Sequence, residues 1–426
     1  MFDFGAFRTL FRSRSTTSLL LSVATAACGV ALLASCGQSE VVSDEDDESS
    51  DGEGPTEADL TSPPRSSGPL VFANRCTSGK RITISALGDI LLHSGLQTQA
   101  YASPDKFGSL WNNVRSPLQK ADLAYANFEG PAAEGTASGG RQVTDPGLRF
   151  DKVVYSSFPL FNYHPSLIDG VKDFGIDFVS TANNHANDRG SVGVDKTIDN
   201  MRSRGLAFAG TRRSNEEEKF YAVSEKNGIR IGWVACSFST NGNPDPKKQT
   251  LLCYKDKAKV LDIIKTLPEK ERVDAVLVTP HWGNEYKHTP AAAEKALGRE
   301  FLDAGAKAVL GGHPHVLQPW EKVTMPDGEE RFIIYSLGNF VSGQVTTKMG
   351  VPTRTSLMLF LGLTKTTDGK VLVNGAKYLP LAMASKPWRV SAAAVGSDSY
   401  KWVDTMFGAE NRITADGDVN PSAGCP

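Results

Sequence analysis

Short apolar runs alternate with amphipathic segments along the chain from residue 81 onward. Most of these runs end at glycine, asparagine or proline, a pattern that predicts buried strands. We predict strands at 81–87, 121–126, 176–182, 230–236, 274–279, 306–310 and 331–336. Apolar positions with helical spacing predict helices at 165–174, 195–204, 258–267 and 291–304. Strands that alternate with helices indicate an α/β sheet, and two further strands at 356–363 and 371–379 predict a β-rich C-terminal flank.

Polar side chains with ligand or acid–base chemistry follow many of the predicted strands, at the point where each strand ends. In chain order they are Asp89, Glu129, Asn184, His185, His281, His313 and His315. Because the carboxyl ends of strands in an open α/β sheet meet along one crevice, we expect these side chains to converge. Mixed nitrogen and oxygen donors suit Mn, Fe or Zn, and this many donors is enough for two ions that share a bridging carboxylate.

The most specific motif is Gly311-Gly312-His313-Pro314-His315. The paired glycines allow a sharp turn where the preceding strand ends. Pro314 fixes its own φ between two imidazoles, and we expect it to hold both histidines in extended geometry. Five of the seven histidines lie in or near the strand-end motifs, which favours a shared role over separate structural roles.

Each of the other motifs also has an ordinary structural interpretation when it is taken alone. Asp89 and Asn184 are common turn residues, because their side chains bond nearby backbone amides. Glu129 could be a surface acid, and His281 could simply pack against Trp282. The metal-site hypothesis therefore rests on the whole set and on its order along the chain.

The N-terminal segment predicts export. An arginine-containing start precedes an apolar stretch, residues 19–33, that is short for a membrane span. The sequence Leu33-Ala34-Ser35-Cys36 resembles a bacterial lipobox. We expect residues 1–35 to be a lipoprotein signal peptide and Cys36 to carry lipid; an uncleaved N-terminal anchor is the alternative. Either one predicts an extracytoplasmic protein held at the cell membrane.

Residues 36–69 are rich in serine, glycine, proline and acidic side chains and have few apolar ones. Such a segment cannot bury enough surface to fold, so we predict a disordered tether, with an acidic cation-binding tail as the alternative. The folded domain is expected at 70–426. A formal net charge of −2 gives no basic field, so nucleic acid is not an expected partner.

Four cysteines remain once the signal peptide and the lipidated Cys36 are set aside. An even number in an exported protein predicts two disulfides, for which three connectivities exist. Cys236 and Cys253 form the local pair, which leaves Cys76 and Cys425 to join the two ends of the domain.

Six motifs taken together resemble the CapA family of capsule and poly-γ-glutamate synthesis proteins, whose fold resembles the calcineurin-like metallophosphatases. The motifs, which span about 82–345, are G-D-I-L-L (88–92), A-N-F-E-G (126–130), A-N-N-H-A-N-D-R-G (182–190), H-W-G-N-E-Y (281–286), G-G-H-P-H-V (311–316) and Y-S-L-G-N-F (335–340). The resemblance implies an α/β fold of the layered α+β type, a metallophosphatase-like αββα sandwich with a strand-end metal site.

The resemblance also implies roles for individual residues. Glu129 would bridge two divalent ions, and His185, oriented by Asp188, would protonate a leaving group. The remaining metal ligands would be Asp89, Asn184, His281, His313 and His315.

One position departs from the phosphatase pattern. Those enzymes carry D-x-H in the first motif, whereas the third position here is Leu91. His93 and Glu285 are candidates to replace the missing ligand, and Arg149 and Arg189 are candidates to hold an anion. Two hypotheses therefore stand: a cell-surface metal-dependent phosphoesterase, and a non-hydrolytic accessory or anchoring factor. Either would work with an anionic surface polymer and a membrane polymer-synthase complex.

Overall fold

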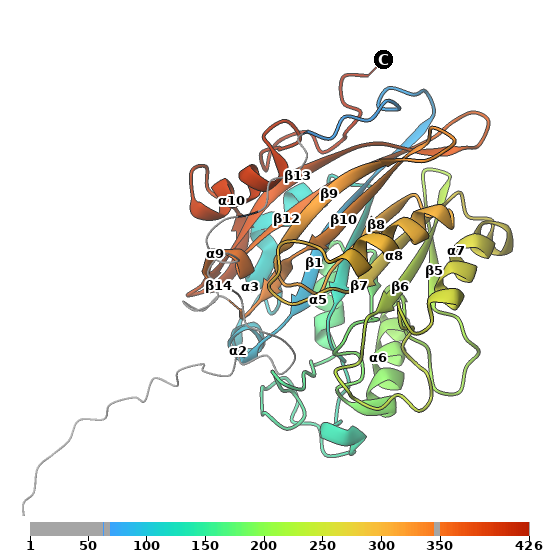
Figure 1. Ribbon diagram of the computed structural model, residues 1–426. Helices are drawn as coiled ribbons and strands as arrows, with labels where there is room; N and C mark the ends of the chain where they lie inside the picture. The colour runs from blue at the N-terminus through green and yellow to red at the C-terminus, as the bar shows by residue number, and fades with distance from the viewer. Residues whose placement is uncertain (1–62, 64–68, 345–349, 426) are drawn as a thin grey trace, which may run out of the picture. The chain divides into compact units, whose positions relative to one another are not determined.

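The computed structural model describes residue 63 and residues 69–344 and 350–425 (Figure 1). The signal peptide, Cys36 and nearly all of the predicted tether lie outside these described residues. Among the helices of the described ranges, none combines the length and the apolar character needed to cross a bilayer.

The first β-sheet has the strand order β14-β13-β12-β1-β2-β3-β4, and β11 also pairs with β1. Strands β1 to β4 run parallel to one another, whereas β12, β13 and β14 extend the sheet in antiparallel fashion. The bounds are β1 Lys80–Leu91, β2 Leu123–Phe128, β3 Phe178–Ser180, β4 Ala207–Ala209, β11 Asn339–Ser342, β12 Thr355–Lys365, β13 Val371–Ser385 and β14 Trp388–Ala392. The predicted β-rich C-terminal flank is therefore an extension of the first sheet.

The second β-sheet has the order β5-β6-β7-β8-β10-β9. Its four inner strands are parallel, and β5 and β9 close the two edges in antiparallel fashion. The bounds are β5 Tyr221–Lys226, β6 Ile229–Ser237, β7 Ala275–His281, β8 Ala308–Leu310, β9 Leu317–Thr324 and β10 Glu330–Leu337.

The two sheets pack face to face, and helices cover their outer faces (Figure 1). One apolar cluster lies between the sheets, a second joins the first sheet to α2, α3, α5 and α6, and a third joins the second sheet to α7 and α8. The helices are α2 Ser94–Ala102, α3 Gly108–Trp111, α4 Arg115–Leu118, α5 Ser166–Phe174, α6 Gly190–Arg204, α7 Lys257–Glu271, α8 Ala292–Asp303, α9 Gly350–Thr353 and α10 Asp398–Phe407, with short 3₁₀ turns at Asn112–Val114 and Ser138–Gly140. The predicted αββα sandwich is confirmed.

This layering explains why the inner strands read as continuous apolar runs. In β7, Ala275 and Leu277 face the cluster between the sheets, whereas Val276 and Val278 face the helices. Side chains alternate between the two faces of a strand, so a strand that is covered on both faces is apolar at most of its positions.

Two disulfides connect distant or looped parts of the domain. Cys236 at the end of β6 is bonded to Cys253, and Cys76 near the start of the domain is bonded to Cys425. These are the local pair and the end-to-end pair considered from the sequence.

Candidate metal centre

The seven strand-end residues lie at the carboxyl ends of strands from both sheets. These residues are 0% to 5% exposed, so the whole group is buried. Asp89 is in β1, and the others follow or end β2, β3, β7 and β8, in the order Glu129, Asn184, His185, His281, His313 and His315. The predicted convergence thus requires both sheets.

One donor group combines Asp89, Glu129 and His281, whose ligand atoms all lie within 4.8 Å of one another. Nε2 of His281 is 2.9 Å from Asn184 Oδ1 and 3.4 Å from Glu129 Oε1. Asn127, which the sequence reasoning did not single out, donates from Nδ2 to Asp89 Oδ1 at 2.8 Å. The parallel register of β1 and β2 pairs Asp89 with Asn127, so the amide holds the carboxylate in place.

A second donor group combines Glu285, His313 and His315 within the same 4.8 Å limit. His315 joins the two groups, because its Nδ1 lies 3.3 Å from Asp89 Oδ2 and 3.1 Å from Asn339 Oδ1. An amide oxygen can only accept, so Asn339 favours a proton on Nδ1 and leaves Nε2 of His315 free to bind a metal.

The backbone of the H-P-H motif is not extended, which corrects the expectation from Pro314. His313 and His315 have φ values of 97° and 58°, in the left-handed region that non-glycine residues rarely adopt. Each such residue costs about 1–3 kcal/mol, and such strain clusters at functional sites. The hydrogen bonds of the neighbouring Gly312 to Pro280 and Trp282 hold this part of the chain against the end of β7.

Three buried atoms at the centre have no hydrogen-bond partner in the part of the chain that the structure describes. They are Asp89 Oδ2, Glu129 Oε1 and His313 Nδ1, one from each of three chain segments. A buried carboxylate oxygen or imidazole nitrogen without a partner is costly, unless a ligand completes its bonding. Carboxylates and imidazoles at this spacing are ligands suited to Mn, Fe or Zn, so the residues present fit a divalent metal.

The electrostatics of the metal-free centre show how strongly it attracts positive charge. Burial would raise the pKa of Glu129, but the imidazoles of His281 and His315 outweigh burial and lower it to about 2. Burial would lower the pKa of His315, yet Glu129 and Asp89 raise it to about 10. Burial and its two histidine neighbours hold the pKa of His313 well below its usual value. A neutral imidazole and anionic carboxylates are the forms that bind metals.

His185 and Asp188 form a buried pair, with His185 Nδ1 2.8 Å from Asp188 Oδ2. The same carboxylate accepts hydrogen bonds from the Phe161 amide at 2.6 Å and from Asn243 Nδ2 at 3.1 Å, so its position is fixed. Burial lowers the pKa of His185, but the charge of Asp188 outweighs burial and raises it. Asp188 therefore orients the ring and favours its protonated form.

The two arginines considered as anion holders have different surroundings. The guanidinium of Arg189 is buried and donates to the carbonyl oxygens of Thr136, Leu160 and Asp188, so it fixes a loop. Arg149 is an exposed side chain of the loop before α5.

Leu91 occupies the position of the missing histidine, and His93 is a candidate to replace it. The Leu91 side chain is buried in the cluster between the first sheet and its helices, so it offers the centre nothing. His93 Nδ1 lies 3.1 Å from the Gly343 amide, and its Nε2 has no hydrogen-bond partner among the described residues.

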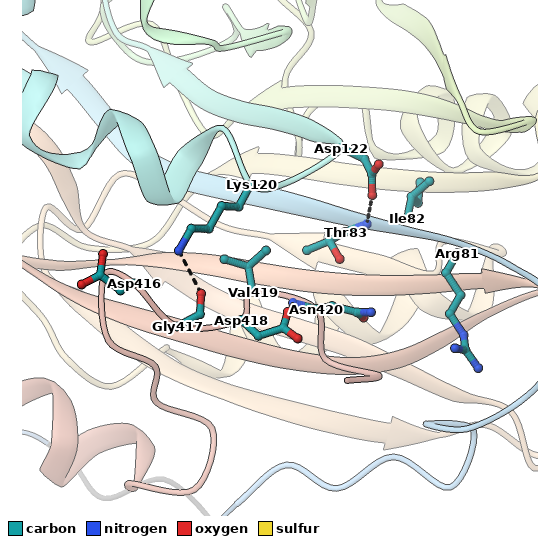
Figure 2. A pocket seen from close by; sticks show the side chains of 10 residues that line it. All are labelled: Arg81, Ile82, Thr83, Lys120, Asp122, Asp416, Gly417, Asp418, Val419 and Asn420. Atoms are coloured by element: carbon teal, nitrogen blue, oxygen red, sulfur yellow. Dashed lines mark hydrogen bonds between the residues drawn. The ribbon is translucent and has the colours of Figure 1, made fainter. Parts of the chain in front are cut away.

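A separate pocket of about 460 Å³ lies at the opposite ends of the same strands (Figure 2). It is lined by Arg81 and Thr83 at the start of β1 and by Lys120 and Asp122 just before β2. Asp122 accepts a hydrogen bond from the Thr83 amide and Lys120 donates to the Gly417 carbonyl, so these groups are satisfied by the fold. The pocket is not part of the strand-end centre.

A sandwich of two sheets between helix layers, with carboxylates, an amide and imidazoles at the strand ends, defines a metallophosphatase-like protein. Residues 83–344 match the family model of the bacterial capsule synthesis protein PGA_cap, so the chain belongs to this family. The predicted resemblance to the CapA family is confirmed.

Two relatives carry the name CapA. The chain is 28% identical over 283 residues to the capsule biosynthesis protein CapA of Bacillus anthracis, which covers 63% of this chain and 62% of that protein. It is 27% identical over 291 residues to the PGA biosynthesis protein CapA of Bacillus subtilis, which covers 68% of this chain and 70% of that protein. The chain thus spans less than two thirds of the length of the Bacillus anthracis relative.

Among solved structures, the chain is similar to a hypothetical protein of Thermus thermophilus, with 16% identity, a TM-score of 0.41 and coverage of 70% of this chain and 99% of that one. It is also similar to the NAD nucleotidase of Haemophilus influenzae, with 12% identity, a TM-score of 0.43 and coverage of 81% and 59%. Both TM-scores are too low to support a fold assignment. The fold is therefore assigned from the strand order and helix layers of the chain itself.

Proposed function

We propose that this chain is a cell-surface protein of capsule or poly-γ-glutamate synthesis that binds two divalent metal ions at the strand ends and hydrolyses a phosphoester. The observation that carries the proposal is the pair of adjoining metal-ligand groups, Asp89-Glu129-His281 and Glu285-His313-His315. Three buried atoms of these groups have no hydrogen-bond partner among the described residues. The similarity to two CapA proteins of capsule and PGA biosynthesis supports the biological setting.

Each part of the centre has a chemical role in this proposal. Two bound divalent cations would neutralise phosphoryl oxygens and lower the pKa of a bound water. Glu129 lies against His281 and interacts with the charge of His315, which suits it to bridge two ions. His185 carries a proton that Asp188 stabilises, so it is the general acid for the departing oxygen.

The second candidate is a non-hydrolytic accessory factor that binds or anchors an anionic polymer. Leu91 favours it, because an imidazole expected in the first motif is replaced by a side chain buried elsewhere. The proposed location is the same for both candidates: a lipid at Cys36 would hold the domain at the outer face of the membrane, near a polymer synthase. Replacing Cys36 with serine should release the protein from membranes, and unchanged membrane association would refute the lipid anchor.

Metal content measured together with turnover tests the main proposal. The full-length protein is purified from membranes, its Mn, Fe and Zn are quantified, and phosphomonoesters and phosphodiesters are offered as substrates. His313→Ala should lose both metal and activity, whereas His185→Ala should keep the metal and lose activity. His164→Gln, outside the centre and bonded to Ser166, is the matched histidine control.

Three results would count against this proposal. Tight metal binding without turnover of any phosphoester favours the accessory factor. Release of fragments from purified poly-γ-glutamate would indicate a polymer peptidase. A protein that binds none of the three metals would overturn the metal centre itself.

A further inference from the structure

The departure at Leu91 raises the question of which side chain completes the second donor group. Two candidates approach the centre, His93 after β1 and Glu285 after β7. They differ in chemistry, since one offers an imidazole and the other a carboxylate. Their positions relative to the ligand atoms of His313 and His315 decide between the two.

Two backbone groups contact His93 Nδ1, the Gly343 amide at 3.1 Å and the Leu91 carbonyl at 3.3 Å. An amide N–H can only donate and a carbonyl oxygen can only accept, so these two contacts favour opposite protonation of Nδ1 and do not fix the tautomer. The position of the ring is more informative. His93 belongs to neither donor group of the centre, whereas Glu285 belongs to the second.

The chain around Glu285 is fixed to the H-P-H motif. The next residue, Tyr286, donates its backbone amide to the Pro314 carbonyl at 2.8 Å, between the two histidines. Tyr286 has a φ of 61°, and its hydroxyl accepts a hydrogen bond from Gln344 Nε2 at 3.0 Å, so both its backbone and its side chain are held in place. The Glu285 carboxylate consequently lies within 4.8 Å of the ligand atoms of both histidines.

We infer that Glu285 is a metal ligand and that it takes the place left by Leu91, so that the second ion is bound by Glu285, His313 and His315. This inference rests on the proposed metal centre and adds a ligand to it. A carboxylate oxygen is a harder ligand than an imidazole nitrogen. Compared with a site built from histidines alone, this site should therefore favour Mn²⁺ over Zn²⁺.

The test measures metal stoichiometry rather than turnover. Full-length protein in detergent is treated with EDTA and titrated with Mn²⁺, and bound metal is counted by elemental analysis and by the electron paramagnetic resonance of Mn²⁺. The variants are Glu285→Gln, which keeps the size of the side chain, and His93→Ala. Glu300→Gln, a surface glutamate of α8 that pairs with Lys257, is the control.

Wild type, the His93 variant and the control should each bind two equivalents. The Glu285 variant should bind one, with the second site weakened at least as much as the 10–100-fold typical for loss of an outer-sphere partner. The spectrum of an interacting Mn²⁺ pair should be replaced by that of an isolated ion. Equal melting temperatures of wild type and variant in EDTA will show that the variant folds.

The inference would be overturned if the Glu285 variant still bound two equivalents of Mn²⁺. It would also be overturned if the His93 variant, and not the Glu285 variant, lost one equivalent. Wild type that binds no Mn²⁺, Fe²⁺ or Zn²⁺ would overturn the proposed function, and the inference with it. Wild type that binds two ions without hydrolysing any phosphoester would leave the ligand assignment standing while refuting hydrolysis.

Discussion

The two glycines that precede the H-P-H histidines should respond differently when each is replaced by alanine. Gly311→Ala should mainly lower the stability of the fold, and Gly312→Ala should mainly weaken metal binding. A Cβ on Gly311 would lie 2.0 Å from the Tyr335 carbonyl oxygen and 2.7 Å from Trp282 Nε1, whereas ordinary contacts are 3.4–4 Å. Gly311 is also bonded to β10 on both sides, through the Ile334 carbonyl and the Leu337 amide. Gly311→Ala must therefore push β8 and β10 apart.

The cost of that separation combines an overpacked core, at about 1–3 kcal/mol, with one or two weakened hydrogen bonds at about 1 kcal/mol each. We expect Gly311→Ala to lose about 3 kcal/mol or more of folding free energy, which lowers the melting temperature by about 4 °C or more in a domain of this size.

Gly312→Ala meets a different neighbour. Its Cβ would lie 3.0 Å from Asp89 Oδ1 and 3.7 Å from His281 Nδ1, so the carboxylate must shift by a few tenths of an ångström. Metal sites tolerate changes of about 0.2 Å in ligand distance. We expect a stability loss below about 1 kcal/mol in the metal-free protein, but metal affinity about 10–100-fold weaker, similar to the loss of an outer-sphere partner.

Thermal unfolding in EDTA and Mn²⁺ titration, applied to both variants, separate the two effects. Gly311→Ala should melt earlier than Gly312→Ala in EDTA, whereas Gly312→Ala should lose most of the Mn²⁺-dependent rise in melting temperature. A Gly311 variant as stable as wild type, or a Gly312 variant with unchanged Mn²⁺ affinity, would refute the reasoning.

Three further predictions address charge and covalent structure. His315 has a pKa raised to about 10 in the metal-free protein, so metal binding at pH 7–9 should release about one proton and should strengthen as pH rises towards 10. Calorimetry in buffers of different ionisation enthalpy counts that proton, and binding without proton release would contradict the prediction. Asp188→Asn removes the charge that outweighs burial, so the pKa of His185 should fall and the basic limb of the pH–rate profile should move to lower pH; an unchanged His185 titration by NMR argues against it. Replacing Cys76 and Cys425 with serine should cost about 2–5 kcal/mol of stability with metal content unchanged, which chemical denaturation and elemental analysis can check.

Much of the fold could be predicted because both faces of the inner strands are covered. The largely apolar runs 274–279 and 331–336 correspond to β7 and β10, since burial of both faces favours apolar side chains at successive positions. The edge strands β5 and β9 were missed for the opposite reason. In β9, partly exposed Pro319 and Glu321 on one face and Lys322 on the other interrupt the apolar pattern.

The helix α2 was also missed, because its sequence has little amphipathic contrast. Only Leu96, Gln97 and Ala100 of its nine residues are buried, and Gln97 is polar. Its Nε2 donates to the Leu92 and Ser156 carbonyls, so a glutamine occupies a position where the pattern expects an apolar side chain.

The sequence by itself determined which side chains are available at the strand ends, because a donor directly after an apolar run has only one edge of the sheet to occupy. Asp89, Glu129, His281 and the H-P-H histidines follow this logic, and the structure brings them within reach of one another. It also predicted the alternation of strands and helices, since these periodicities are local properties of the chain, whereas the sandwich of two sheets was implied only by the resemblance to the CapA family.

Only the tertiary structure decided how those donors are grouped and which of the others join them. Glu285 reaches the histidines through a hydrogen bond between the loops after β7 and β8, and Asn339 reaches His315 because β11 pairs with β1. The left-handed backbone of the histidines and the burial of Leu91 likewise depend on contacts across sheets and layers. Such contacts join residues far apart in sequence, so no local pattern encodes them.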